Sequence, residues 1–205
     1  SGGFRWYGCR KLSEFFYFYY LNTPCSMEET TLQRLKYPIG EFEAPQQMDA
    51  SQRNDSIHQI ETLPQRLRWL VQDLMEVQLE TPYRPGGWTV RQVVHHLPDC
   101  HMNSMIRFKL ALTEDRPLIR PYAENRWAEL PDSEAPVGIS LDLLEALHAR
   151  WVILLKQLSP TDWSRIFVHP EFGQEYRLDI ALAMYAWLGN LLLALIEGLV
   201  AREGW

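Results

Sequence analysis

The stretch that decides the fold is residues 89–113, TVRQVVHHLPDCHMNSMIRFKLALT. Its apolar positions recur every three or four residues, which is the spacing of one face of a helix. Thr89, with Gln92 three residues later, is a capping-box signature for the start of that helix. The preceding TPYRPGG, residues 81–87, is a loop by its prolines and glycines. The stripe that this helix presents to a core consists of Val90, Val94, Leu97, His101, Met105, Phe108 and Leu112.

Three more long helices are expected on either side of this one. A first apolar stripe predicts a helix from Arg53 to about Val77, a second predicts a helix capped by Ser140, and a third helix opens at Asp179 and continues to about Arg202. Residues 115–139 are rich in proline and acidic residues, so they predict a long crossover loop with one short helical turn near Trp127. Residues 167–177, FVHPEFGQEYR, are expected to be irregular. The prediction is an all-α four-helix bundle with a long crossover loop.

Composition narrows the function classes. The 205 residues carry a formal net charge of −6 and are 46% hydrophobic, which suits a packed core and argues against a nucleic-acid partner. No run reaches the ~18 consecutive apolar residues of a membrane span. The nearest, residues 181–196, is interrupted by Gly189 and Asn190. We therefore expect a soluble, cytoplasmic protein that does not insert into a membrane.

Residues 1–26 differ in character from the rest. They begin Ser-Gly-Gly and contain FRWY and FFYFYY, so we interpret them as an appended aromatic segment before a domain at residues 27–205. Rings at this density predict packing on the bundle, on a partner or on a second copy. Cys9 and Cys25 could pair or could both be free thiols, whereas Cys100 is expected to be a buried thiol.

Several motifs resemble the YfiT branch of the DinB-like family. They are YRPGGWTVRQVVHHL at 83–97, RFKLALTED at 107–115, LHARW at 147–151 and HPEFG at 169–173. The resemblance implies a helical bundle in which three histidines hold a zinc- or nickel-type metal. It also implies a metal-dependent hydrolase or thiol S-transferase, and a homodimer.

The departure from this family lies in residues 187–196, WLGNLLLALI. Family members read approximately W-H-x-x-H-H-x-A-H-I there, so the resemblance implies that Leu188, Leu191, Leu192 and Leu195 replace histidines. It places two ligands at Leu191 and Leu195 and the third at His96. Leucine has no lone pair, so we expect no bound metal and no cofactor, with His96 as the residual candidate. Trp187, His101, His96 and the four leucines are expected to line an apolar pocket.

Other histidine, cysteine and aspartate side chains do not obviously replace the two missing metal ligands. His95 and His96 point about 100° apart along a helix, and His101 is five residues from His96. Cys100 and His96 are four apart and could form a dyad, but a small buried thiol is the simpler interpretation. Asp99 is expected to bond a histidine or to face solvent. No residue is assigned a catalytic role.

Three interpretations of function follow. The first is an engineered, metal-free binding scaffold for a small apolar ligand or a designed protein partner, because the histidines are replaced together while the neighbouring motifs remain. The second is an enzyme, either the metal-dependent hydrolase or thiol S-transferase of the family or a redesigned metal-free enzyme using His96, Asp99, Cys100 or His101. The third is a carrier that displays residues 1–26.

Overall fold

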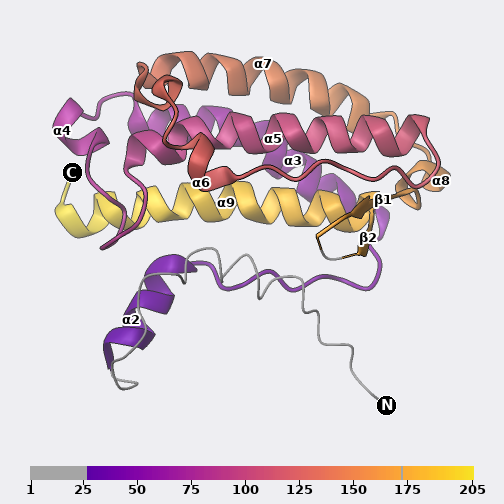
Figure 1. Cartoon of the computed structure of the whole chain (residues 1–205), viewed down its shortest axis with the longest axis horizontal. Coiled ribbons are helices and arrows are strands. Elements are labelled where there is room, and N and C mark those ends of the chain that lie inside the picture. The colour runs from indigo at the N-terminus through magenta and orange to yellow at the C-terminus, as the bar shows by residue number, and fades with distance from the viewer. Residues whose placement is uncertain (1–26, 172) are drawn as a thin grey trace.

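Four long helices lie side by side along most of their lengths (Figure 1). The computed structural model describes residues 27–171 and 173–205. The long helices are α3 (Ala50–Val71), α5 (Val90–Thr113), α7 (Val137–Lys156) and α9 (Leu178–Glu203). Helices α3 and α5 each pack against both α7 and α9. The predicted all-α four-helix bundle is confirmed.

The shorter elements lie at the ends of the bundle and in its connections. They are α2 (Met27–Lys36), α4 (Glu76–Leu79), α6 (Glu124–Trp127), the 3₁₀ turn η1 (Pro131–Glu134), α8 (Pro160–Trp163), β1 (Ile166–His169) and β2 (Gln174–Arg177). Strands β1 and β2 form an antiparallel hairpin in which Phe167 pairs with Tyr176. The stacked rings of Phe167 and Tyr176 lie 5.4 Å apart. The expectation of an irregular segment there was therefore wrong, because two buried aromatic side chains fix the register.

Three expected helix boundaries were also wrong. The first helix begins at Ala50 rather than Arg53, because Asp49 and Gln52 form a capping box there. The first helix ends at Val71 rather than Val77, because the chain turns there and Leu74 donates its N–H to the Val71 carbonyl at 3.2 Å. The third helix begins at Val137, so Ser140 lies inside its first turn rather than capping it. The capping box of Thr89 and Gln92 is confirmed. Helix α9 ends at Glu203 and is capped by Gly204, whose φ of 71° is in the left-handed region that favours glycine.

The crossover between α5 and α7 is held to the bundle by polar contacts. Arg91 Nη1 donates to the Ala135 carbonyl at 3.1 Å, and Gln92 Nε2 donates to the Ala128 carbonyl at 3.0 Å. Near its start, the Ile119 N–H donates to the Val168 carbonyl of β1 at 3.0 Å. The expected long connection with a helical turn at Trp127 is confirmed, and it is an ordered strap along the helices.

The core consists of two clusters, one at each end of the bundle. One gathers around Phe108, Trp151 and Tyr185, and the other contains Leu63, Leu97 and Ile196. Helix α9 runs through both clusters. Within the described residues it is the one helix long and apolar enough to cross a membrane, with a mean hydropathy of 1.7. Because 72% of that apolar stretch is buried against the other helices, its composition is also that of a core helix.

The predicted appended segment, residues 1–26, and the predicted Cys9–Cys25 pair lie outside the described residues. Cys100 is buried and free, as expected. Asp179 is buried at the start of α9, where it accepts hydrogen bonds from the Arg177 guanidinium and the Ile180 N–H. An acidic residue in the first turn of a helix complements the helix dipole, so this end of α9 is firmly anchored.

Candidate functional site

The adjacent histidines of α5 point to different surroundings. Nitrogen Nε2 of His95 lies 2.9 Å from the Ala135 carbonyl, and its Nδ1 lies 2.7 Å from the Ser140 hydroxyl. A carbonyl only accepts, so Nε2 carries the proton and Nδ1 accepts from Ser140. Both nitrogens of His95 are thus engaged in tying α5 to the crossover and to α7.

His96 lies in an apolar setting. Its ring centroid is 4.6 Å from that of Trp88, and the side chain is 7% exposed. Burial lowers the pKa of His96 to about 4, so the imidazole is neutral at pH 7. Trp88 also packs against the core cluster that contains Leu192 and Leu195. A neutral imidazole in this setting can offer one lone pair to a metal or a hydrogen-bond donor.

The leucines at the positions where the resemblance implies histidines belong largely to the core. Leu191, Leu192 and Leu195 are each 6% exposed. Leu192 and Leu195 share a cluster with Val93, Val94 and Leu97 of α5, the residues on either side of the His95–His96 pair. Leu188 is half-buried and contacts both core clusters. Leu188, Leu191, Leu192 and Leu195 share one face of α9 and form an apolar surface, called the leucine wall, that packs toward the part of α5 around the His95–His96 pair. The expected pocket at these residues stays a prediction.

Trp187 and His101 each have a polar partner outside the four leucines. Trp187 donates from Nε1 to the Gly40 carbonyl at 3.3 Å, and its ring is 5.6 Å from that of Phe42. His101 is fully buried and lies 2.7 Å from His148 of α7, nitrogen to nitrogen. The partnership with His148 was missed from the sequence. The signal was present, because residue 148 falls on the stripe of Leu141, Leu144, Trp151 and Leu155.

The donor atoms do not fit a metal centre of catalytic type. Among residues 27–171 and 173–205, no group of three or more histidine, cysteine and acidic side chains could hold a metal ion. Of the three ligands implied by the resemblance, His96 alone has a donor atom. A catalytic zinc keeps three protein ligands and one open position. We therefore derive no step through a metal at this site.

The thiol near His96 is not activated. Burial raises the pKa of Cys100 to about 12, so the thiol stays protonated at neutral pH. The burial of Cys100 agrees with its simpler interpretation as a small buried thiol and does not favour a nucleophilic dyad with His96. Asp99 is half-buried, and burial raises its pKa to about 6. The Asp99 carboxyl is therefore not the fully exposed charge that was one of the two expectations for it.

A polar cluster that the sequence did not reveal lies on the same helix faces, toward the hairpin. Cys100 is one turn beyond His96 on α5, and Tyr185 is one turn before Leu188 on α9. Arg107 donates from Nη1 to the Tyr185 hydroxyl at 2.9 Å. The charge of Arg107 also acts on neighbouring groups of α5, the crossover and β1, which are Cys100, Tyr122, Glu124 and His169. This polar cluster and the leucine wall together form the candidate site.

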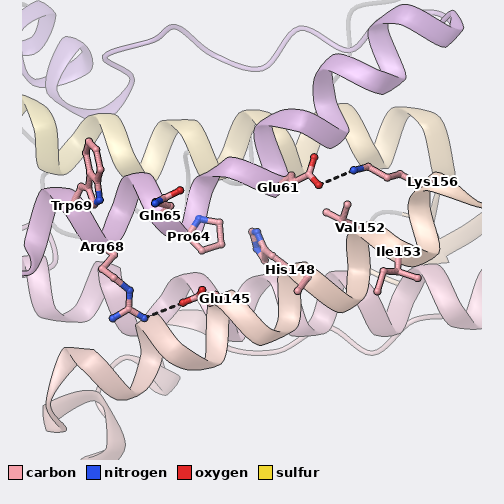
Figure 2. Close-up of a pocket in the computed structure, with 11 residues that line it drawn as sticks. Glu61, Pro64, Gln65, Arg68, Trp69, Glu145, His148, Val152, Ile153 and Lys156 are labelled. Carbon is pink, nitrogen blue, oxygen red and sulfur yellow. Dashed lines mark hydrogen bonds and ion pairs between the residues drawn. The ribbon is translucent and has the colours of Figure 1, made fainter.

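A separate groove of about 490 Å³ lies between α3 and α7 (Figure 2). An ion pair from Lys156 to Glu61 lies at one end, and one from Arg68 to Glu145 lies at the other. His148 lines the groove, but its two ring nitrogens are bonded to His101 and to the Ile60 carbonyl. Because both nitrogens are engaged, the His148 ring is not available to act as a base or a ligand toward a molecule in this groove.

The class that the fold and site define is a helical bundle with a long crossover and buried histidines between its helices. The sequence pattern of the DinB superfamily matches residues 59–187. A Bacillus cereus protein named "Putative metal-dependent hydrolase" is 52% identical over 171 residues, which are 83% of this chain and 98% of that relative. An Oceanobacillus iheyensis relative of the same description is 52% identical over 170 residues, with the same two coverages of 83% and 98%.

Solved structures agree with these sequence comparisons. The structure of YfiT from Bacillus subtilis, described as a probable metal-dependent hydrolase with an unusual four-helix bundle topology, is 47% identical. It superimposes with a TM-score of 0.82 and covers 84% of this chain and 99% of that one. A mycothiol-dependent maleylpyruvate isomerase, 15% identical with a TM-score of 0.52 over 66% and 58% of the two chains, shares the fold alone. This chain belongs to the DinB superfamily.

Proposed function

We propose that this chain is a metal-independent binding bundle, in which the leucine wall beside His96 receives a small apolar ligand. The observation that carries the proposal is that buried leucines occupy positions 191 and 195. Both stand at implied metal-ligand positions, both are 6% exposed, and neither has a donor atom. Apolar side chains favour an apolar occupant, since each contact removes apolar surface from water.

Leu188 is the residue through which such a ligand would meet the wall. It is half-buried and touches both core clusters, whereas Leu192 and Leu195 are enclosed by their neighbours. The expectations from the sequence that the histidines were exchanged by design, that a designed protein is the partner and that the chain forms a homodimer remain predictions. The display of residues 1–26 as an appended segment also remains a prediction.

A metal-dependent hydrolase is the second candidate. It is favoured by the names of relatives 52% identical to this chain and by the presence of His96. It requires two further donor atoms close to His96 that the leucines do not supply. The two candidates therefore differ in a property that can be measured directly, which is the amount of metal bound.

Two measurements on the full chain test the proposal. Incubation with Zn²⁺ or Ni²⁺, followed by dialysis against a weak chelator, should leave far less than about one equivalent of metal. The neutral dye N-phenyl-1-naphthylamine should bind with a rise in fluorescence, and Leu188→Asn should weaken that binding. Leu143→Asn, an exposed leucine of α7, is the matched control and should leave binding unchanged. Stoichiometric metal, or dye binding that ignores Leu188, would contradict the proposal.

A further inference from the structure

Arg107 is a half-buried cation, and within the described residues its guanidinium makes one hydrogen bond, which leaves most of its donors unused. Its guanidinium has five N–H donors. One nitrogen donates to the hydroxyl of Tyr185 at 2.9 Å. Across the part of the chain that the structure describes, no ion pair joins Arg107 to a carboxylate. Partial burial of a charge without an ion-pair partner is costly. An anion bound next to the guanidinium of Arg107 would therefore be stabilised.

Another enclosed arginine of the same helix shows how this chain satisfies such a group. Arg91 is 6% exposed and forms ion pairs with both Glu76 and Glu80. It also donates to the Ala135 carbonyl. Arg107 has a different environment, although both side chains extend from α5. The two arginines therefore differ in their ion-pair partners, although they extend from the same helix.

The acidic residues near Arg107 do not supply an equivalent partner. Glu124 of α6 interacts electrostatically with Arg107, which lowers its pKa, but burial outweighs this and raises the pKa overall. The described residues contain no ion pair between Glu124 and Arg107, so this carboxyl does not engage the guanidinium as Glu76 and Glu80 engage that of Arg91. Glu171 acts on Glu124 and on His169 from beyond β1. The remaining neighbours are neutral at pH 7, since burial lowers the pKa of His169 and raises that of Tyr122.

We propose that Arg107 binds the carboxylate of a small organic acid, with the hydroxyl of Tyr185 as a further donor. This inference rests on the proposed function and names the ligand class of that same site. A guanidinium fork matches the two oxygens of a carboxylate in one plane. The Tyr185 hydroxyl accepts from Arg107 and keeps its own proton to donate to the ligand.

The apolar part of the acid would lie toward Leu188. Tyr185 and Leu188 are three residues apart on α9, so they occupy neighbouring places on one helix face. On α5, Cys100 lies between His96 and Arg107 along the same direction. A ligand with its carboxylate at Arg107 therefore has its body beside the leucine wall. A neutral analogue would keep the apolar contacts and lose the charge.

Calorimetric titration of the full chain with benzoate, benzamide and inorganic phosphate tests this inference. Benzoate should bind about tenfold or more tightly than benzamide, because it alone pairs with a guanidinium. Arg107→Gln should remove that difference, and Arg107→Lys should retain part of it, since a lysine keeps the charge without the fork. Lys109→Gln, an exposed cation two residues along α5, is the matched control and should change benzoate affinity by less than about twofold.

Each contrary result has one meaning. Equal affinity for benzoate and benzamide, or benzoate binding that survives in Arg107→Gln, overturns the role of Arg107. Phosphate binding as tight as benzoate overturns the carboxylate class. If the neutral dye binds and benzoate binds no more tightly than benzamide, this inference alone fails. If neither the dye nor benzoate binds, the proposed function fails as well. Should Arg107→Gln not fold, Tyr185→Phe takes its place and must weaken benzoate relative to benzamide.

Discussion

The Nδ1 nitrogen of His101 lies 2.7 Å from the Nε2 nitrogen of His148, in the centre of the bundle. Nitrogen Nδ1 of His148 lies 2.6 Å from the Ile60 carbonyl of α3. A carbonyl only accepts, so His148 donates to Ile60 from Nδ1 and accepts from His101 with Nε2. His101 Nε2 then carries a lone pair that is buried without a hydrogen-bond partner among the described residues. The pair fixes α3, α5 and α7 relative to one another while both rings stay neutral.

Stability should fall as the solution becomes acidic. Burial lowers the pKa of His148 to about 4 and that of His101 well below its ordinary value of 6.5. Below pH 6.5 these two histidines therefore bind protons in the unfolded chain but not in the folded chain. The free energy of unfolding decreases from there toward about pH 4. The loss from one such histidine is on the order of 3 kcal/mol across that window. Urea unfolding at several pH values measures it.

His148→Gln isolates this contribution. The variant lacks one of the buried bases, so its free energy of unfolding should depend less steeply on pH than that of the parent chain. Asp99, whose pKa is raised to about 6 by burial, opposes the histidines in the same range, but it is present in both proteins and cancels in the comparison. His58→Gln, an exposed histidine of α3, should leave the slope as in the parent. An equal slope in His148→Gln would contradict this account of the His101–His148 pair.

Helix periodicity was enough to predict the bundle. The stripe from Val90 to Leu112 and the capping box at Thr89 placed α5 correctly, because a long helix repeats its signal over many residues. The hairpin was missed because two four-residue strands, joined through a turn with Pro170 and Gly173, carry no comparable repeat. Its register depends on the stacking of Phe167 with Tyr176, which is a contact made only after the chain folds.

Only part of the candidate site could be predicted from the sequence, because contacts between distant segments form only after the chain folds. The apolar wall follows from residues close together on one helix, such as Leu188 and Leu191, so local sequence reveals it. Arg107 and Tyr185 are 78 residues apart and meet only through the packing of α5 against α9. His101 and His148 likewise come from different helices. Partners of this kind have no spacing that a single sequence could display.

Introducing histidine at both Leu191 and Leu195 should create metal binding. Together with His96, the double variant would offer three imidazoles, and we expect about one equivalent of Zn²⁺ to survive dialysis, against far less in the parent. Without metal the double variant should melt at a lower temperature, because each change replaces a buried aliphatic group by a polar ring at a cost of roughly 1–3 kcal/mol. Metal analysis and thermal unfolding, each with and without Zn²⁺, measure both effects.

The matched control for this experiment is Leu191→Asn with Leu195→Asn, which introduces polar groups that are weak ligands for zinc. It should lower the melting temperature without acquiring metal. Zinc binding by the asparagine variant, or its absence from the histidine variant, would mean that positions 191 and 195 do not converge on His96. The implied site would then lie elsewhere in the bundle.

Two glycines of α9 should respond oppositely to alanine. Alanine in a helix interior is ordinarily better than glycine by about 1 kcal/mol. At Gly198 the nearest atom to an added Cβ is Arg202 Nη1 at 3.6 Å, which is ordinary contact, so Gly198→Ala should gain up to about 1 kcal/mol. At Gly189 the same carbon would lie 2.5 Å from Leu63 Cδ2 and 3.3 Å from His101 Cε1.

Gly189→Ala should therefore destabilise the chain despite the better helix propensity. Leu63 is 2% exposed and His101 is fully buried, so neither can move without disturbing the core or the bond to His148. Overpacking of this kind costs typically about 1–3 kcal/mol, which exceeds the propensity gain. We expect a net loss of about 1–2 kcal/mol, seen as a melting temperature several degrees below that of Gly198→Ala. Equal melting temperatures would mean that α9 does not approach α3 and α5 as closely at Gly189 as these contacts require.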